Sequence, residues 1–387
     1  AFSYVTGLVT VGKKNVDVTA LSYTVNYADA VPTVTASYAG FINGATSGVI
    51  SGQSCVTAYL VTSNVGTTPS TSCSGGTATD YAPSYVAGTV TINQKPITIT
   101  ASSPTVTYGD AVPTVTAIYT LANSQGSGAL STQPTCVTTY TTTTHVADPV
   151  ANRTTSCSGA AALNYSFSYA TGTVTVNRKG VTVTASSPTV TYGDAIPTIT
   201  PTYAGWVNSE GPSVLTTPTT CTTVYTTSTS VAASAANRQT SCSASAAADY
   251  SFSFTTGLVT VQKKTVTVTA SSHGVTYGDA APTVTASYAG FINGATSSVI
   301  SGQSCVTAYT VTSNVGTTPS TSCSGGTATD YAPSYVAGTV TISQKGVVIT
   351  ASSSTVQYGA AVPTVTASYS GFVNSQTQAT EIGRAHV

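Results

Sequence analysis

Short segments in which apolar and polar residues alternate recur along the whole chain. The segment Val181-Thr-Val-Thr-Ala shows this period of two, and a second alternating segment, Thr114–Tyr119, follows a turn-like sequence in the preceding part of the chain. Such alternation is typical of β-strands with one buried face. No apolar run approaches the roughly 18 residues of a membrane-spanning helix. The pattern predicts a mainly β protein of many short strands, without a membrane span.

The same arrangement of segments repeats five times. The opening segments start at lysines separated by 81, 84, 85 and 81 residues: Lys14, Lys95, Lys179, Lys264 and Lys345. A fixed period of this kind predicts tandem structural units. We divide the chain into 1–13 (the closing strand of a truncated repeat), 14–94 (repeat 1), 95–178 (repeat 2), 179–263 (repeat 3), 264–344 (repeat 4) and 345–380 (truncated repeat 5).

Repeats 1 and 4 are almost the same sequence. Between Pro32–Gln94 and Pro282–Gln344 only three of 63 positions differ. This near-identity indicates a recent duplication or recombination. An array that changes length in this way suits a spacer or a multivalent surface better than a single active site.

A Tyr-Gly-Asp turn follows each opening segment. Gly tolerates a positive φ and Asp hydrogen-bonds the nearby backbone, so we interpret the motif as structural. It comprises Tyr108, Gly109 and Asp110, then Tyr192, Gly193 and Asp194, then Tyr277, Gly278 and Asp279. Repeat 1 has Tyr27-Ala28-Asp29 and repeat 5 has Tyr358-Gly359-Ala360. Calcium binding at the turns is the alternative, although each turn offers one carboxylate where such sites usually gather several oxygen ligands.

Each complete repeat contains two cysteines. The predicted pairs are Cys55 with Cys73, Cys136 with Cys157, Cys221 with Cys242, and Cys305 with Cys323. A hairpin centred on Asn64 brings the first pair face to face. Metal ligation would require four ligands, usually in closely spaced pairs, which no repeat has. We therefore expect one disulfide per complete repeat, no metal and no cofactor, and an oxidising, extracellular location.

Consecutive repeats have no flexible linker between them. The closing strand of repeat 2 ends at Asn177-Arg178 and the next opening segment starts at Lys179. A joint of so few residues has little slack. The sequence therefore predicts a semi-rigid, rod-shaped array.

The composition excludes several function classes. Only 6% of residues are charged and the net charge is zero, so no basic surface exists for nucleic acid. Few ionisable groups remain for catalysis, and His145 and His273 have no nucleophile at a repeated spacing. Trp206 is expected to be a semi-buried anchor rather than a sugar-stacking platform. The repeated tyrosines Tyr81, Tyr165, Tyr250 and Tyr331 are expected to pack with their hydroxyls at the surface.

These landmarks resemble the MBG-type repeat of the YGX subtype. The resemblance rests on Tyr-Gly-Asp…Pro-Thr-Val-Thr, Gly-Phe-Ile-Asn-Gly and Asn-Tyr-Ser-Phe-Ser-Tyr…Gly-Thr-Val-Thr-Val, and it covers nearly all of 1–380. It implies tandem β-grasp-like or immunoglobulin-like domains in bacterial surface proteins of the adhesin kind, with no catalytic residues. Repeat 2 departs from it, with Leu121-Ala-Asn-Ser-Gln in place of Gly-Phe-Ile-Asn-Gly.

The leading functional hypothesis is a non-catalytic stalk on the bacterial cell surface. Two alternatives remain open, namely weak multivalent binding of glycans or host surface proteins by the repeats themselves, and a spacer within a secreted multidomain enzyme. Residues 381–387 match no repeat and read as the translation of a common short-read sequencing adapter, so we expect them not to belong to the protein.

Overall fold

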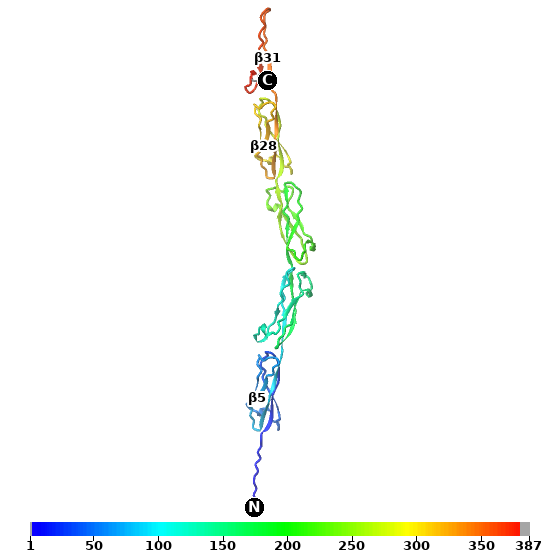
Figure 1. Ribbon diagram of the computed structural model, residues 1–387, viewed down its shortest axis with the longest axis vertical. Helices are drawn as coiled ribbons and strands as arrows, with labels where there is room; N and C mark the ends of the chain where they lie inside the picture. Colours follow the sequence, from blue (N-terminus) through cyan, green and yellow to red (C-terminus); the bar gives the residue numbers. More distant parts are fainter. Residues whose placement is uncertain (1, 380–387) are drawn as a thin grey trace. The chain divides into compact units, whose positions relative to one another are not determined.

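The computed structural model describes residues 2–379, and the suspected adapter segment 381–387 lies outside them. The described chain forms two compact units. The first holds the residues up to 180 together with 206–214 and 247–251, and the second holds the remaining described residues. Figure 1 colours the chain along its sequence and labels β5 in repeat 1 and β28 in repeat 4. Strands dominate, as the alternating pattern predicts.

Repeat 1 contains seven strands and one 3₁₀ turn. They are β1 (Lys14–Ala20), β2 (Tyr23–Asn26), β3 (Ala36–Ala39), η1 (Ser47–Val49), β4 (Ser54–Thr57), β5 (Ser70–Ser74), β6 (Tyr81–Val86) and β7 (Gly88–Asn93). One sheet has the order β3-β1-β6 and the other β2-β7-β5-β4. β1 pairs with β6 in parallel and with β3 antiparallel. β2 pairs with β7 in parallel. The parallel pair β1–β6 of the first sheet is thus followed along both segments by the parallel pair β2–β7 of the second sheet.

The two sheets of repeat 1 share one small core. Alternate residues of β1, Val16 and Val18, are fully buried, and they pack with Ile50, Cys73 and Tyr81 from the other segments. Residues 14–344, all of which the structure describes, contain no α-helix. Two short sheets with a common core and no covering helix are a β-sandwich, so the β-grasp alternative does not describe these repeats.

Repeat 4 has the same order of elements as repeat 1, whereas repeats 2 and 3 have additional 3₁₀ turns and a closing strand that is divided in two. Repeat 2 contains β8 (Lys95–Ala101), β9 (Thr105–Thr107), β10 (Ala117–Ile118), η2 (Ala122–Ser124), η3 (Ser127–Ala129), β11 (Thr135–Thr138), η4 (Val150–Arg153), β12 (Thr154–Ser158), β13 (Tyr165–Ala170), β14 (Gly172–Thr173) and β15 (Thr175–Asn177). Repeat 3 contains β16 (Lys179–Ala185), β17 (Thr189–Thr191), β18 (Pro201–Ala204), η5 (Pro212–Val214), β19 (Thr220–Thr223), η6 (Ala235–Asn237), β20 (Gln239–Ser243), β21 (Tyr250–Thr255), β22 (Gly257–Leu258) and β23 (Thr260–Gln262). Repeat 4 contains β24 (Lys264–Ala270), β25 (His273–Thr276), β26 (Ala286–Ala289), η7 (Ser297–Val299), β27 (Ser304–Thr307), β28 (Ser320–Ser324), β29 (Tyr331–Val336) and β30 (Gly338–Ser343).

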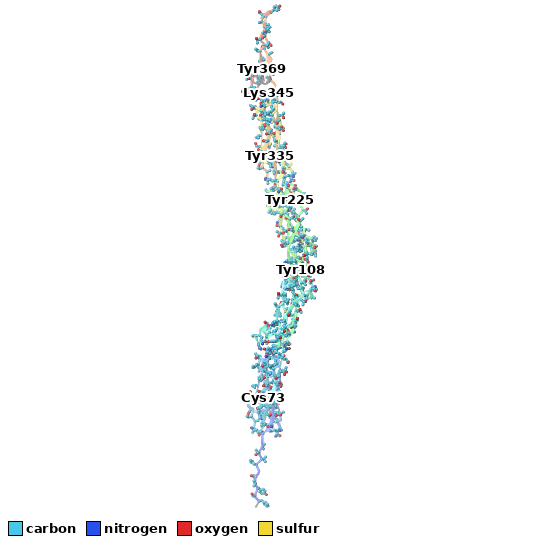
Figure 2. All side chains as sticks on the ribbon, viewed as in Figure 1. Cys73, Tyr108, Tyr225, Tyr335, Lys345 and Tyr369 are labelled. Carbon is cyan, nitrogen blue, oxygen red and sulfur yellow. A yellow bond between two sulfur atoms is a disulfide. The ribbon has the colours of Figure 1, made fainter. Side chains whose placement is uncertain are left out.

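One disulfide joins the two strands of a hairpin in every complete repeat, which confirms the one disulfide per complete repeat predicted from the sequence. In repeat 1, Cys55 on β4 lies directly opposite Cys73 on β5, labelled in Figure 2. The remaining bridges join Cys136 to Cys157, Cys221 to Cys242, and Cys305 to Cys323. Each bridge fixes a hairpin whose tip lies at one end of its repeat. The extra residues of repeats 2 and 3 fall at these tips and form η4 and η6.

The incomplete repeats at the two ends of the chain differ from the complete ones. The assignment of 1–13 to the closing strand of a truncated repeat stays a prediction: residues 2–13 form no strand in the structure, and Val9 and Val11 are 86% and 89% exposed. The equivalent strands of repeat 2 pair with β8 and β9, opening strands of their own repeat, and this sequence has no such strands before residue 14. Within 345–379, the part of repeat 5 that the structure describes, the strands are β31 (Val348–Ala351) and β32 (Ala367–Ser370).

The glycine at the start of each closing Gly-Thr-Val-Thr strand lies where the chain passes between the sheets. A Cβ on Gly88 would stand 2.5 Å from the carbonyl oxygen of Ala20 and 2.6 Å from Oγ1 of Thr71. We therefore expect Gly88→Ala to lower the free energy of unfolding of repeat 1 by about 1–3 kcal/mol, measured by hydrogen exchange of the β1 amides. Gly48→Ser, which copies Ser298 of repeat 4, is the control. Equal effects of the two changes would contradict this role.

Candidate functional site: the joint between repeats

The Tyr-Gly-Asp turn forms the end of each repeat that contacts the next one. In repeat 2 the Asp110 carboxylate accepts a hydrogen bond from the Thr107 N–H at 2.9 Å, and Gly109 has a φ of 84°. In repeat 1 the pKa of the Asp29 carboxyl lies below its ordinary value. The main cause is the hydrogen bond from the Asn26 N–H, and the second is the hydrogen bond from the Lys95 side chain. The geometry of the turn is therefore set by its own Asp and by a residue with positive φ.

A buried tyrosine on the cysteine hairpin holds each turn from inside the repeat. The hydroxyl of Tyr59 donates to the carbonyl oxygen of Asp29 at 2.9 Å, and Tyr225 donates to that of Asp194 at 3.0 Å. Tyr140 and Tyr309 do the same in repeats 2 and 4. Burial raises the pKa of all four hydroxyls. The hairpin and the turn thus form one connected end face.

Two tyrosines from consecutive repeats meet at each joint between complete repeats. The turn tyrosine of one repeat contacts the edge of the tyrosine that starts the closing strand of the next, with centroid distances of 5.4–5.5 Å: Tyr27 with Tyr165, Tyr108 with Tyr250, and Tyr192 with Tyr331. Figure 2 labels Tyr108 at the second joint. Tyr27 and Tyr165 are each 2% exposed. Edge-to-face pairs of this kind stabilise beyond their buried area.

The expected surface position of the closing-strand hydroxyls is wrong. Tyr81 and Tyr331 are buried, and their hydroxyls donate to the carbonyl oxygens of Ile42 and Ile292. The same bonds tie the Gly-Phe-Ile-Asn-Gly segment to the closing strand. Trp206, at the Phe position of that segment, is half-buried and contacts Tyr250 edge-on at 4.7 Å, in the anchor position expected from the sequence.

A carboxylate or amide next to the closing tyrosine binds the hairpin tip of the preceding repeat. Asn164 accepts from the Val65 N–H at 2.9 Å, Asp249 from Val146 at 2.7 Å, and Asp330 from Val231 at 2.7 Å. A neighbouring tip side chain takes part in a second bond: the Asn164 amide donates to Asn64 Oδ1, His145 Nδ1 bonds to the Asp249 carboxylate, and the Ser230 hydroxyl donates to Asp330. The same joint is thus built with three different polar pairs.

Further polar contacts repeat across the joints. The Asn of the Gly-Phe-Ile-Asn-Gly position donates to a tip carbonyl oxygen of the preceding repeat: Asn123 to Val61, Asn208 to Thr142, Asn293 to Thr227, and Asn374 to Val311. Lys95 pairs with the turn carboxylate of Asp29 at 3.0 Å. This ion pair is about one-third exposed, so solvent screens it. At this first joint, hydrogen bonds and buried rings therefore contribute more than the ion pair.

The joint between repeats 2 and 3 contains an ionisable pair. His145 Nδ1 lies 2.7 Å from Asp249 Oδ2, and the imidazole stacks on Tyr108. Glu210 accepts hydrogen bonds from the hydroxyls of Tyr108 and Tyr250 close by. The hydrogen bond to Asp249 raises the pKa of the His145 imidazole above its ordinary value of 6.5, although burial acts in the opposite direction.

Because the pKa of His145 is raised in the folded protein, the stability of this joint is expected to decrease as the pH rises. The folded joint favours protonated His145, so its contribution to stability is complete below about pH 6.5 and is lost as the pH rises through the raised pKa. We expect faster hydrogen exchange of the Val146 amide above that pKa, after correction for intrinsic exchange. Histidine-labelled NMR gives the pKa itself. His145→Asn, which copies Asn64, should abolish the pH dependence, and a pH dependence that survives it would contradict the assignment.

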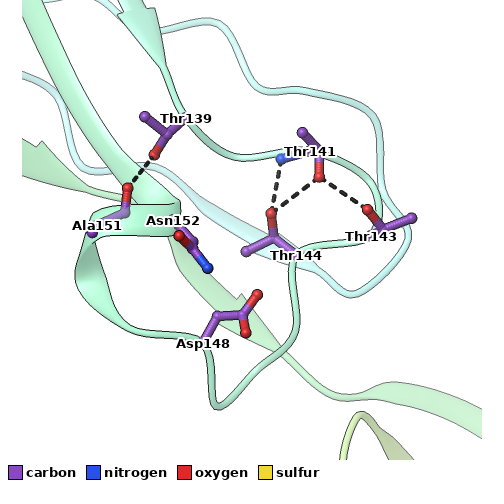
Figure 3. A pocket seen from close by; sticks show the side chains of 7 residues that line it. All are labelled: Thr139, Thr141, Thr143, Thr144, Asp148, Ala151 and Asn152. Carbon is purple, nitrogen blue, oxygen red and sulfur yellow. Dashed lines mark hydrogen bonds between the residues drawn. The ribbon is translucent and has the colours of Figure 1, made fainter.

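A polar hollow of about 400 Å³ lies at the hairpin tip of repeat 2 (Figure 3). Its hydroxyls largely bond within the loop: Thr139 donates to the carbonyl oxygen of Ala151, and Thr141 contacts Thr143 and Thr144. The Asp148 carboxylate accepts from the His145 N–H. The lining has no aromatic or large apolar wall of the kind typical of ligand pockets. We therefore interpret the hollow as part of the tip.

The calcium alternative would require a metal-binding cluster of side chains, and a membrane-spanning helix would require a long apolar segment. Among residues 2–379, no three His, Cys, Asp or Glu side chains gather closely enough to hold a metal ion. The Asp249 and Asp330 carboxylates bind hairpin tips instead of joining the turn carboxylates in a cation site. None of the helical segments in this described part of the chain has the length and apolar character needed to cross a membrane.

These features define a tandem array of small, disulfide-containing β-sandwich domains. Residues 181–260 and 266–341 match the model of the MBG domain (YGX type), in two consecutive copies. The family resemblance seen in the sequence is thus confirmed for repeats 3 and 4. No curated protein sequence matches the chain.

Solved structures with some similarity are multidomain proteins. Immunoglobulin domains 1–4 of Sidekick-1 align with 83% of this chain and 96% of theirs, at 6% identity and a TM-score of 0.21. Drosophila N-cadherin EC1-4 aligns with 72% of this chain and 83% of its own, at 9% identity and a TM-score of 0.23. At these TM-scores the matches do not define a shared fold.

Proposed function

We propose that this chain is a non-catalytic, extracellular spacer in a bacterial cell-surface protein of the adhesin kind. The observation that carries the proposal is the joint, in which the same tyrosine pair and the same bond to a hairpin tip recur between consecutive complete repeats. A repeated contact of this kind holds successive domains in a defined orientation without a flexible linker.

Two further features support the same function. One disulfide in each complete repeat suits an oxidising compartment outside the cytoplasm. The nearly identical repeats 1 and 4 have different neighbours, yet the Phe of the Gly-Phe-Ile-Asn-Gly segment packs edge-on with the closing tyrosine in both, Phe41 with Tyr81 and Phe291 with Tyr331. An array with such a standard joint can gain or lose whole units and still span a distance.

The test is to display the chain between a cell anchor and a peptide epitope and to measure the height of the epitope above the cell. Deleting 264–344, one full period, should lower the epitope by roughly 40 Å, the length of about 13 residues of strand. An unchanged height would contradict a spacer. Glycan and host-protein arrays probed with the same chain should stay silent, and saturable binding would favour the multivalent-binding function instead.

A further inference from the structure

The residue in the middle of each turn touches the next repeat. A Cβ built on Gly109 would lie 2.4 Å from Cγ2 of Val207, and one on Gly278 would lie 2.4 Å from Cγ2 of Val373. On Gly193 it would lie 1.8 Å from Cδ1 of Ile292. At these three joints a β-branched side chain occupies the space that a methyl group on the glycine would need.

The first joint departs from this arrangement on both sides. Repeat 1 has Ala28 in the middle of its turn, with a φ of 64°, and repeat 2 has Ala122 at the position of Val207, Ile292 and Val373. Both alanines are partly buried and pack against the same core cluster, which also contains Tyr27, Leu121 and Tyr165. Relative to the other joints, Ala28 adds one methyl group in the turn, and Ala122 lacks the two methyl groups of the facing valine.

We propose that Ala28 and Ala122 form a matched steric pair that fits the end face of repeat 1 to repeat 2. This end face accepts a repeat with alanine at the facing position and excludes one with valine or isoleucine there. The equivalent end face of repeat 4 has the opposite combination of residues. Repeat 4 shares almost all of its sequence with repeat 1 after the turn, yet it has Gly278 and is followed by Val373.

The physical basis is overlap in a packed contact. At the other three joints, a methyl group on the turn residue would lie less than 3.0 Å from the facing valine or isoleucine, a distance that real Cβ atoms essentially never show. By the same geometry, valine at position 122 opposite Ala28 would force the first joint to shift. Glycine at position 28 adopts a positive φ at lower cost than alanine. Ala28→Gly should therefore be close to neutral by itself, and it should remove the overlap that Ala122→Val creates.

The test is a double-mutant cycle in the full, oxidised chain. The readout is hydrogen exchange of the Val65 amide, which donates to Asn164 across this joint. Ala122→Val is expected to speed this exchange by at least about tenfold. Ala28→Gly combined with Ala122→Val should bring the rate back to within about threefold of the original. Exchange in the β24–β29 ladder of repeat 4 should not change. No effect of Ala122→Val, or no rescue by Ala28→Gly, would overturn the proposal.

A reciprocal cycle at the second joint covers the case in which Ala122→Val prevents repeat 2 from folding. Gly109→Ala should speed exchange of the Val146 amide, and adding Val207→Ala, which recreates the Ala28–Ala122 pair, should reverse most of that effect. The backbone strain of alanine is common to both variants, so the rescue isolates the steric overlap. Absence of rescue would overturn the matched pair while leaving the spacer function standing, since that function requires only that the joints exist.

Discussion

Replacing Cys55 and Cys73 together by alanine should lower the free energy of unfolding of repeat 1 by about 3 kcal/mol. The reason is the 18-residue separation of the pair, because a cross-link that closes a loop of this length restricts the unfolded chain by about that amount. The core of a single repeat is small, so the loss is a large fraction of its stability. Denaturant-dependent hydrogen exchange of the β1 and β5 amides measures it.

Repeat 4 provides the control within the same molecule. Its disulfide between Cys305 and Cys323 spans the same 18 residues in a nearly identical sequence, and it stays intact in the variant. Exchange in repeat 4 should therefore remain at its original level. Equal protection of repeats 1 and 4 in the variant would show that the bridge contributes little to stability.

Tyr27→Ala should have a comparable effect, concentrated at the first joint. Tyr27 is 2% exposed, faces the Tyr165 ring at 5.4 Å and accepts a hydrogen bond from the Gln125 amide at 3.1 Å. Removing a buried aromatic ring typically costs 3–5 kcal/mol, so we expect a loss of about 3 kcal/mol. Hydrogen exchange of the Val65 amide and the thermal unfolding of repeats 1 and 2 would report it.

Tyr27→Phe separates the ring from the hydroxyl. The phenyl ring keeps the edge-to-face contact and leaves the Gln125 amide without this acceptor, so the cost should be about 1 kcal/mol. A loss as large as that of Tyr27→Ala would mean that the hydroxyl, rather than the ring pair, holds the joint. As a control, Phe2→Ala removes a ring that is 93% exposed and should have no effect on either repeat.

The strands and the disulfides could be predicted because their signals are local. Alternation in the Lys179–Ala185 segment reports one buried face, and the position of Asn64 midway between two cysteines reports a hairpin. The Tyr108-Gly109-Asp110 turn could likewise be predicted, because its geometry is determined by three consecutive residues. For such features the interacting atoms are close in the sequence, so a single repeat contains the information.

The joint could not be predicted in the same way, because its partners lie about 100 residues apart. Nothing in repeat 1 alone indicates that the Val65 N–H needs an acceptor from Asn164, or that Tyr165 is buried by the next turn. The tyrosine hydroxyls were therefore expected at the surface. One signal was present: Ala28 and Leu121-Ala122 break the repeat pattern on the two sides of one joint. Paired departures of this kind indicate contact once the tandem order is known.

The proposed spacer function predicts an extended chain in which the joints keep successive repeats in line, and small-angle X-ray scattering of the oxidised chain tests this prediction most directly. With about 40 Å per repeat, five aligned units give a radius of gyration of about 55 Å, whereas freely turning joints give about 40 Å and a compact chain of this length about 21 Å. We expect a value near 55 Å that does not change with salt, since buried rings and hydrogen bonds hold the joints. A value near 40 Å or below would contradict the account.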